Sequence, residues 1–214
     1  MNKNKILDKL ADIGIVPVVR APSLENALGA VDALARGGIP VAEITMTVPD
    51  AISVIKRLKA EHTDELTIGA GTVTNVSMCK AAIEAGAVFI VTPSVNLEII
   101  EYCKNTGICV VGGALSPTEI LAVWNVGANA VKVFPAQAVG GPGYIKAIHA
   151  PLPRIPLVPT GGVYLENVAE YLKAGALFVC AGTDLVNKNA LSTGDLEAIS
   201  RRAQQYIQEV KKAR

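Results

Sequence analysis

Lys132 is the lysine in this 214-residue chain that is hardest to explain as an ordinary surface residue. It lies in AVKVFP (130–135), an apolar run typical of a buried strand, whereas the other lysines lie in polar, helix-like or terminal segments. Alternation along a strand turns Lys132 and Phe134 inward and Val131 and Val133 outward. Because burial disfavours a charged ammonium, Lys132 would be a candidate neutral amine. Such an amine can attack a ketone and form an imine, which acidifies the adjacent carbon.

Glu43 is the acidic side chain best placed to accompany Lys132. It is a lone acid in the apolar stretch AEITMT (42–47), where Glu43, Thr45 and Thr47 share one face of a strand. An inward glutamate beside an inward lysine could form only a buried ion pair. It could also carry protons, directly or through a water molecule. Both interpretations require the same contact, so the sequence leaves both open.

Two glycine-containing loops could bind an anion. They are PTGGV (159–163), with Thr160, Gly161 and Gly162, and AGT (181–183), with Gly182 and Thr183. Glycine lets backbone N–H groups approach a phosphate closely, and a following helix would add its positive end. Glycine pairs also serve simply as tight turns, which is our interpretation of a third stretch, GGPG (140–143).

Short apolar runs recur at a steady interval and predict the scaffold that positions these residues. Between most of them lie helix-like stretches, and glycine often follows the predicted helix. This pattern predicts one domain over residues 1–214, an α/β (β/α)8 TIM barrel with an extra N-terminal helix over residues 2–11. Helix N-termini are expected at Asn75, Ser94, Ser116 and Glu166, and the last helix over residues 195–212. The expected strands cover residues 15–19, 41–46, 66–70, 88–91, 109–111, 130–134, 156–158 and 177–181.

Composition excludes several classes of function. The formal net charge is +1, from 20 basic and 19 acidic residues, and we therefore expect no nucleic-acid partner. No uninterrupted apolar stretch predicts a signal peptide or a membrane span, so a cytoplasmic location is expected. The four cysteines have no CxxC spacing and are interpreted as small apolar fillers. With two histidines in the chain, no metal site is expected.

Motifs spread along almost the whole chain resemble those of the 2-keto-3-deoxy-6-phosphogluconate (KDPG) and 4-hydroxy-2-oxoglutarate (KHG) aldolase family. They are IVPVVR (15–20), EITMTVP (43–49), GAGTV (69–73), FIVTP (89–93), VKVFP (131–135) and VPTGGV (158–163). The resemblance implies a pyruvate-dependent class I aldolase on a (β/α)8 barrel, usually a homotrimer. It also implies that Lys132 forms a covalent imine with the substrate and that neither a metal nor another cofactor is needed.

The resemblance assigns further roles to residues at the predicted carboxyl ends of the strands. Glu43 would be the general acid and base, Thr72 and Pro93 would line the pyruvate pocket, and Phe134 would pack beside the imine. The substrate would be held by Thr160, Gly161 and Gly162, with Gly162 and Thr183 at the phosphate. Many relatives carry serine in place of Thr183. We add Thr45 and Gly182 as substrate-binding candidates because they too lie at the predicted carboxyl ends of strands.

The sequence departs from part of the family at Thr47, where some members carry an arginine that binds the carboxylate of pyruvate. Arg20, at the end of the first predicted strand, is also found in similar members that share the TVP sequence at 47–49. We hypothesise that Arg20 supplies the cation for this carboxylate or, as a second choice, for the phosphate. A guanidinium can bind either group in bidentate fashion.

The activity implied is reversible cleavage of KDPG to pyruvate and glyceraldehyde 3-phosphate. The 2-keto-3-deoxy-6-phosphogalactonate epimer and 4-hydroxy-2-oxoglutarate are alternative substrates. Among other classes, an epimerase or isomerase barrel would share the phosphate loops but would not need a lysine within a strand. A non-catalytic sugar-phosphate binder or an assembly scaffold on the same barrel could retain both Lys132 and Glu43.

Overall fold

The computed structural model describes residues 3–62 and 65–214, and over these ranges eight parallel strands alternate with helices. The strands are β1 (Ile15–Val19), β2 (Val41–Thr45), β3 (Thr67–Gly71), β4 (Phe89–Val91), β5 (Cys109–Ala114), β6 (Ala130–Val133), β7 (Leu157–Pro159) and β8 (Val179–Ala181). The helices are α1 (Lys3–Ile13), α2 (Leu24–Arg36), α3 (Ala51–His62), α4 (Val76–Glu84), α5 (Leu97–Thr106), α6 (Pro117–Val126), η1 (Gln137–Val139), α7 (Gly141–His149), α8 (Val168–Lys173), α9 (Lys188–Thr193) and α10 (Leu196–Ala213).

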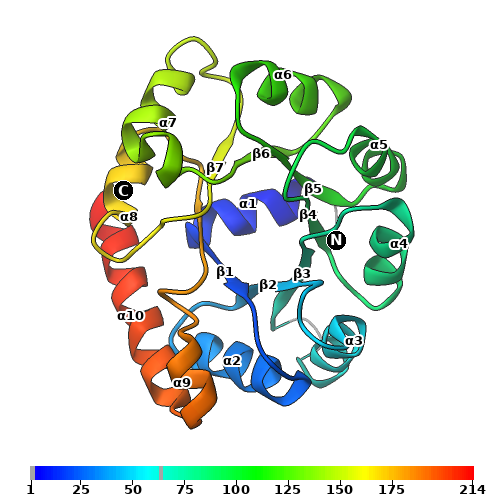
Figure 1. Cartoon of the computed structure of the whole chain (residues 1–214), viewed down its shortest axis with the longest axis vertical. Coiled ribbons are helices and arrows are strands. Elements are labelled where there is room, and N and C mark those ends of the chain that lie inside the picture. Colours follow the sequence, from blue (N-terminus) through cyan, green and yellow to red (C-terminus); the bar gives the residue numbers. More distant parts are fainter. Residues whose placement is uncertain (1–2, 63–64) are drawn as a thin grey trace.

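The strands form a barrel surrounded by the helices (Figure 1). Their order is β7-β6-β5-β4-β3-β2-β1-β8, so consecutive strands from β1 to β7 pair with each other and β8 pairs with β1. Two isolated bridges, Leu157 to Ala176 and Thr160 to Cys180, join the β7 and β8 segments and bring the sheet close to full closure. The prediction of a (β/α)8 barrel is therefore confirmed.

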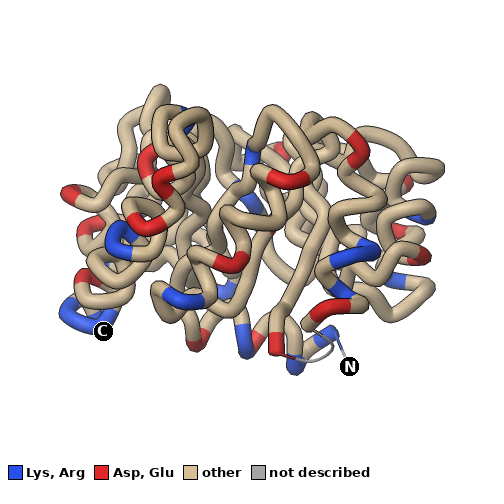
Figure 2. Tube along the Cα trace, turned by 90° about the horizontal axis from the view of Figure 1, so that it is seen from below, with Lys and Arg blue, Asp and Glu red and all other residues tan. Residues whose placement is uncertain are grey.

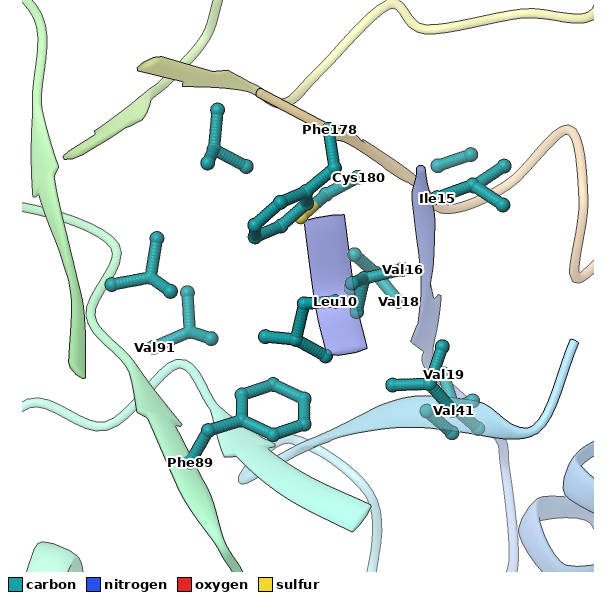
Figure 3. Close-up of a cluster of buried hydrophobic side chains, with 14 of the residues drawn as sticks. Leu10, Ile15, Val16, Val18, Val19, Val41, Phe89, Val91, Phe178 and Cys180 are labelled. Atoms are coloured by element: carbon teal, nitrogen blue, oxygen red, sulfur yellow. The ribbon is translucent and has the colours of Figure 1, made fainter. Parts of the chain in front are cut away.

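Helix α1 lies across the end of the barrel at which the strands begin (Figure 1). Its Ile6 and Leu10 side chains are buried, and Leu10 points into the same apolar cluster as Phe89 and Phe178 (Figure 3). The guanidinium of Arg214 donates to the carbonyls of Ala11 and Asp12 at the end of this helix. The extra N-terminal helix is thus confirmed, although Asn2, where we expected it to begin, lies outside the described residues.

Glycines on β3 let large side chains from neighbouring strands fill the barrel interior. A Cβ atom at Gly69 would lie 2.3 Å from the ring of Phe89, so this ring occupies the space that a β3 side chain would otherwise take. Phe89 is fully buried and pairs in register with Gly69. The lower part of the barrel is consequently a packed apolar layer, as is usual for this fold, and a ligand site is left to the carboxyl ends of the strands.

Two of the four predicted helix N-termini are confirmed, and two are wrong. Asn75 and Ser116 cap α4 and α6 through their side chains. Helix α5 is capped by Asn96 rather than Ser94, because the Asn96 side chain accepts from Ile99 N and also donates to the Thr74 carbonyl. Helix α8 begins after Asn167 rather than at Glu166, because Asn167 first closes a turn by accepting from Tyr164 N. The short elements η1 and α9 were not predicted.

Charged residues of both signs are interspersed around the barrel (Figure 2). All four cysteines are buried and form no disulfide, as expected for apolar fillers, and the thiols of Cys79 and Cys103 share a hydrogen bond of 3.6 Å. No helix in the described part of the chain is long and apolar enough to cross a membrane. Within the same residues, no group of three His, Cys, Asp or Glu side chains could hold a metal ion.

We predict that Leu10→Ala destabilises the barrel by about 2–5 kcal/mol, because it removes a fully buried side chain and leaves a cavity under the strands. Asp8→Ala, at an exposed position of the same helix, is the control and should change the free energy of unfolding by less than about 0.5 kcal/mol. Denaturant unfolding measures both values. Equal stabilities for the two variants would show that α1 does not contribute to the core.

Candidate active site

Lys132 and Glu43 meet inside the barrel, although β6 and β2 are not adjacent strands. The Lys132 Nζ atom lies 3.6 Å from Glu43 Oε1, and the two residues are 3% and 0% exposed. In the described structure, neither carboxylate oxygen of Glu43 accepts a hydrogen bond. A buried carboxylate with unfilled acceptor sites is costly, so the site is suited to a water molecule or a ligand that would fill them. The contact that the sequence predicted is therefore present.

Gly71 provides the space for the Glu43 carboxylate. A Cβ atom at this position would lie 1.8 Å from Glu43 Oε1, which is far inside van der Waals contact. Gly113 has a similar role beside Lys132, its register partner on β6, because the loop after β4 packs against it. The hydroxyl of Thr92 accepts from Gly113 N at 2.8 Å and fixes this loop. Neither glycine was predicted to shape the site, because each acts through contacts that the sequence does not reveal.

Cys180, on β8, lies near Lys132 and Glu43, and its side chain remains a neutral thiol. Burial raises its pKa to about 12, with a further contribution from the negative charge of Glu43. The charge of Lys132 acts in the opposite direction but is a smaller influence. Because this thiol stays protonated near neutral pH, Lys132 and Glu43 are the groups here whose types suit imine chemistry and proton transfer.

A small pocket opens at the carboxyl ends of β7 and β8. Phe134 joins it to the buried pair: its ring centre is 5.6 Å from Lys132 Nζ, and the same side chain lines the pocket. Thr160 is 4% exposed, also lines the pocket, and has a hydroxyl without a hydrogen-bond partner in the described structure. The remaining lining residues are Val18, Arg20, Gly161, Gly162, Val163, Tyr164, Gly182 and Thr183.

The backbone of this pocket is suited to an anion. The N–H groups of Gly161, Gly162, Gly182 and Thr183 donate no hydrogen bond within the described part of the chain. Gly161 and Gly162 have φ angles of +85° and +78°, a conformation that favours glycine. Their loop is held by Gln137, whose N–H donates to the Gly161 carbonyl at 3.0 Å. Free N–H groups on two facing loops are a common arrangement for phosphate binding.

Arg20 stands at the edge of this pocket. It is exposed, and its Nη1 atom lies 3.5 Å from the position of a Cβ atom on Gly182. The structure therefore brings Arg20 together with Gly161, Gly162 and Thr183. The guanidinium has no salt bridge to another described residue, so its donors are available to a ligand.

Thr45, Thr72 and Pro93 occupy other positions around the site. The Thr45 hydroxyl donates to the Val19 carbonyl at 3.0 Å and contacts the Thr47 hydroxyl at 2.8 Å, so it already joins β2 to β1. Thr72 directly follows β3 and has a φ angle of +56°, which is unusual for threonine. Strained residues of this kind are frequent at active sites. Pro93 belongs to the loop that packs against Gly113.

Comparison with known proteins is consistent with this geometry. A family model described as "KDPG and KHG aldolase" matches residues 6–202. A 2-dehydro-3-deoxy-phosphogluconate aldolase from Haemophilus influenzae is 34% identical over 97% of each chain. The KHG/KDPG aldolase of Escherichia coli is 30% identical over 92% of each chain. The solved structure of KDPG aldolase from Legionella pneumophila, with pyruvate captured as a covalent carbinolamine, has a TM-score of 0.87 and 30% identity. The alignment with that structure covers 95% of this chain and 97% of the other. The chain belongs to the KDPG and KHG aldolase family.

Proposed function

We propose that this protein is a class I aldolase that reversibly cleaves KDPG to pyruvate and glyceraldehyde 3-phosphate. The observation that carries the proposal is the buried contact of 3.6 Å between Lys132 and Glu43, next to a pocket with free backbone donors. The H. influenzae and L. pneumophila relatives, named for this activity, support it.

In the first half of the reaction, Lys132 passes a proton to Glu43, directly or through water, and its amine then attacks the C2 carbonyl of the keto acid to form a carbinolamine. Loss of the C2 oxygen as water then leaves a protonated imine, which withdraws electrons from C3. Glu43 supplies and removes the protons of these steps, directly or through water, because its two oxygens have free acceptor capacity beside Nζ. A carbinolamine of this type was captured in the L. pneumophila relative.

In the second half, Glu43 removes the proton of the C4 hydroxyl, again directly or through water. The C3–C4 bond breaks, its electrons pass into the imine to give an enamine, and the aldehyde is released. Protonation of C3 restores the imine, and addition of water returns pyruvate and the free lysine. Thr72, Pro93 and Phe134 line the keto-acid end in this proposal, and the unpaired Thr160 hydroxyl binds a substrate hydroxyl.

The pocket at the carboxyl ends of β7 and β8, lined by Arg20, Gly161, Gly162, Gly182 and Thr183, is called the anion pocket below. It favours a phosphorylated substrate over 4-hydroxy-2-oxoglutarate. Four free N–H groups, the Thr183 hydroxyl and Arg20 suit the three oxygens of a phosphate better than the two of a carboxylate. The phosphogalactonate epimer carries the same phosphate, so it remains a second substrate to be measured. Of the two anions hypothesised for Arg20, its place beside Gly182 supports the phosphate rather than the pyruvate carboxylate.

Two alternatives from other classes are less well supported. An epimerase or isomerase would not require Lys132 within contact of Glu43. A sugar-phosphate binder or scaffold would not require a buried carboxylate with unfilled acceptor sites. We further propose a cytoplasmic homotrimer that acts without metal or another cofactor, in line with the family resemblance.

We predict that borohydride in the presence of pyruvate attaches a reduced pyruvyl group to Lys132. Mass spectrometry of the intact protein and of its peptides would locate the adduct. Lys132→Ala should abolish it, whereas Lys146→Ala, at an exposed lysine of α7, should leave it unchanged. An adduct on another lysine would reject the assignment of Lys132, and an unmodified wild-type protein would reject the class I mechanism.

We predict that Gly71→Ala lowers kcat about 10- to 100-fold, because the new methyl group must displace the Glu43 carboxylate from its position beside Lys132. Gly143→Ala is the matched control, since a Cβ at Gly143 meets no atom within 4 Å. Glu43→Gln keeps the size of the side chain and should lower kcat by about 100-fold or more. Steady-state cleavage rates and thermal unfolding would test these expectations. Full activity in Glu43→Gln would eliminate Glu43 as the proton carrier.

We predict that Arg20→Ala raises KM for the phosphorylated aldehyde about 10- to 100-fold, the effect of losing charge-assisted hydrogen bonds worth about 1.5–3 kcal/mol. The pyruvate concentration that half-saturates borohydride trapping should not change. Arg154→Ala, at an exposed arginine before β7, is the control. If pyruvate saturation weakens instead, Arg20 binds the carboxylate, and if neither constant changes it binds neither group.

A further inference from the structure

Asp184, the residue directly after Thr183, has the densest set of polar contacts near the anion pocket. Its carboxylate accepts from Arg202 Nη2 at 2.8 and 2.9 Å and from Arg202 Nε at 3.2 Å. It also accepts from the Tyr206 hydroxyl at 2.6 Å. Arg202 and Tyr206 lie on α10, and Tyr206 is fully buried. The loop after β8 is therefore attached to the C-terminal helix.

The same carboxylate also reaches the loop after β7. The N–H of Leu165, three residues beyond Gly162, donates to Asp184 Oδ2 at 3.3 Å. Arg202 extends the connection, since its Nη2 atom lies 3.7 Å from Glu166 Oε1. Only isolated bridges pair the β7 and β8 segments, so side chains carry much of the connection between the two loops that form the pocket.

The charge of Asp184 is compensated in this arrangement. Burial alone would raise the pKa of Asp184, but hydrogen bonds from Arg202 and Tyr206 lower it below its ordinary value. The carboxylate is therefore ionised near neutral pH, one residue from a hydroxyl proposed to bind phosphate. An unpaired negative charge there would repel the phosphate, and Arg202 removes this repulsion.

We propose that Asp184 is a positioning residue that joins the two anion-binding loops to α10, while Arg202 both anchors it and neutralises its charge. The proposal rests on the phosphorylated substrate proposed above. The Arg202 guanidinium donates three hydrogen bonds to the Asp184 carboxylate. Its role therefore differs from that of Arg20, which lines the pocket itself. The group to be recognised is the phosphate at the end of the substrate remote from Lys132.

The test compares aldol addition of pyruvate to glyceraldehyde 3-phosphate and to glyceraldehyde in the full-length protein. We expect Arg202→Gln to lower the ratio of the two kcat/KM values about tenfold or more, mainly through KM for the phosphorylated aldehyde. The rate with glyceraldehyde and the borohydride adduct should be unchanged. The double variant Asp184→Asn/Arg202→Gln should recover part of the lost preference for glyceraldehyde 3-phosphate, because it no longer contains the uncompensated carboxylate of residue 184. Arg201→Gln, whose partner is the exposed Glu197 on the same helix, is the control.

Equal losses with both aldehydes, or no recovery in the double variant, would overturn the proposal, because either result indicates a general packing role. Tyr206→Phe removes one hydrogen bond from Asp184 and keeps the ring, so it provides a second test should Arg202→Gln unfold. It should lower the same ratio by a smaller factor, and an unchanged ratio in that variant counts against the proposal. A wild-type protein that forms the adduct but does not prefer the phosphorylated aldehyde would instead overturn the phosphate assignment, and this inference with it.

Discussion

Burial of a lysine beside a glutamate is the constraint on which the rest of the structure depends. Both groups lose solvation in the barrel, and a contact of 3.6 Å recovers only part of that loss because Glu43 makes no hydrogen bond within the described structure. The fold must therefore supply the remaining stability elsewhere. It does so with a packed apolar layer beneath the pair, closed by α1 and filled by Phe89 (Figure 3). Gly71 completes the arrangement by leaving room for the carboxylate.

In the proposed function, the barrel places the reacting groups and the anion pocket on differently paired parts of the sheet. Lys132 and Glu43 lie on strands that form a parallel ladder with a neighbour on each side, and these ladders set their relative position. The pocket for the anion lies instead at the β7–β8 junction, where pairing is limited to isolated bridges. Loops at a weakly paired junction can carry free N–H groups, but they need support from side chains. Gln137 supports one loop from η1, and Asp184 joins both loops to α10.

Local patterns in the sequence were sufficient to predict the barrel and the contact between Lys132 and Glu43. The chemical role of that pair came only from the family resemblance. Period-two alternation placed Lys132 and Glu43 inside, and Asn75 and Ser116 cap helices because their side chains act within one turn. The Glu166 error came from a local turn that Asn167 closes, whereas other features depend on distant partners. Asn96 rather than Ser94 caps α5 partly through a bond to Thr74, and Asp184 gains its role from residues on a helix that follows later in the chain. The position of Arg20 relative to the two anionic ends of a substrate likewise depended on the β1–β8 pairing, which brings it beside Gly182.

Two arginines near the same pocket illustrate why residue type alone does not assign a binding role. Arg20 is exposed at the pocket edge, so its donors are available to a ligand. Arg202 is equally cationic, but its guanidinium is already bound to Asp184. Its net electrostatic contribution is to cancel the negative charge of the Asp184 carboxylate. Because α10 is held in place by its packing against α2 and α8, the loop that Asp184 anchors is fixed relative to the barrel. Since Lys132 is fixed to the same barrel, the distance between its amine and the anion pocket is a property of the fold. In the proposed function, that distance would select substrates by the length of chain between ketone and phosphate.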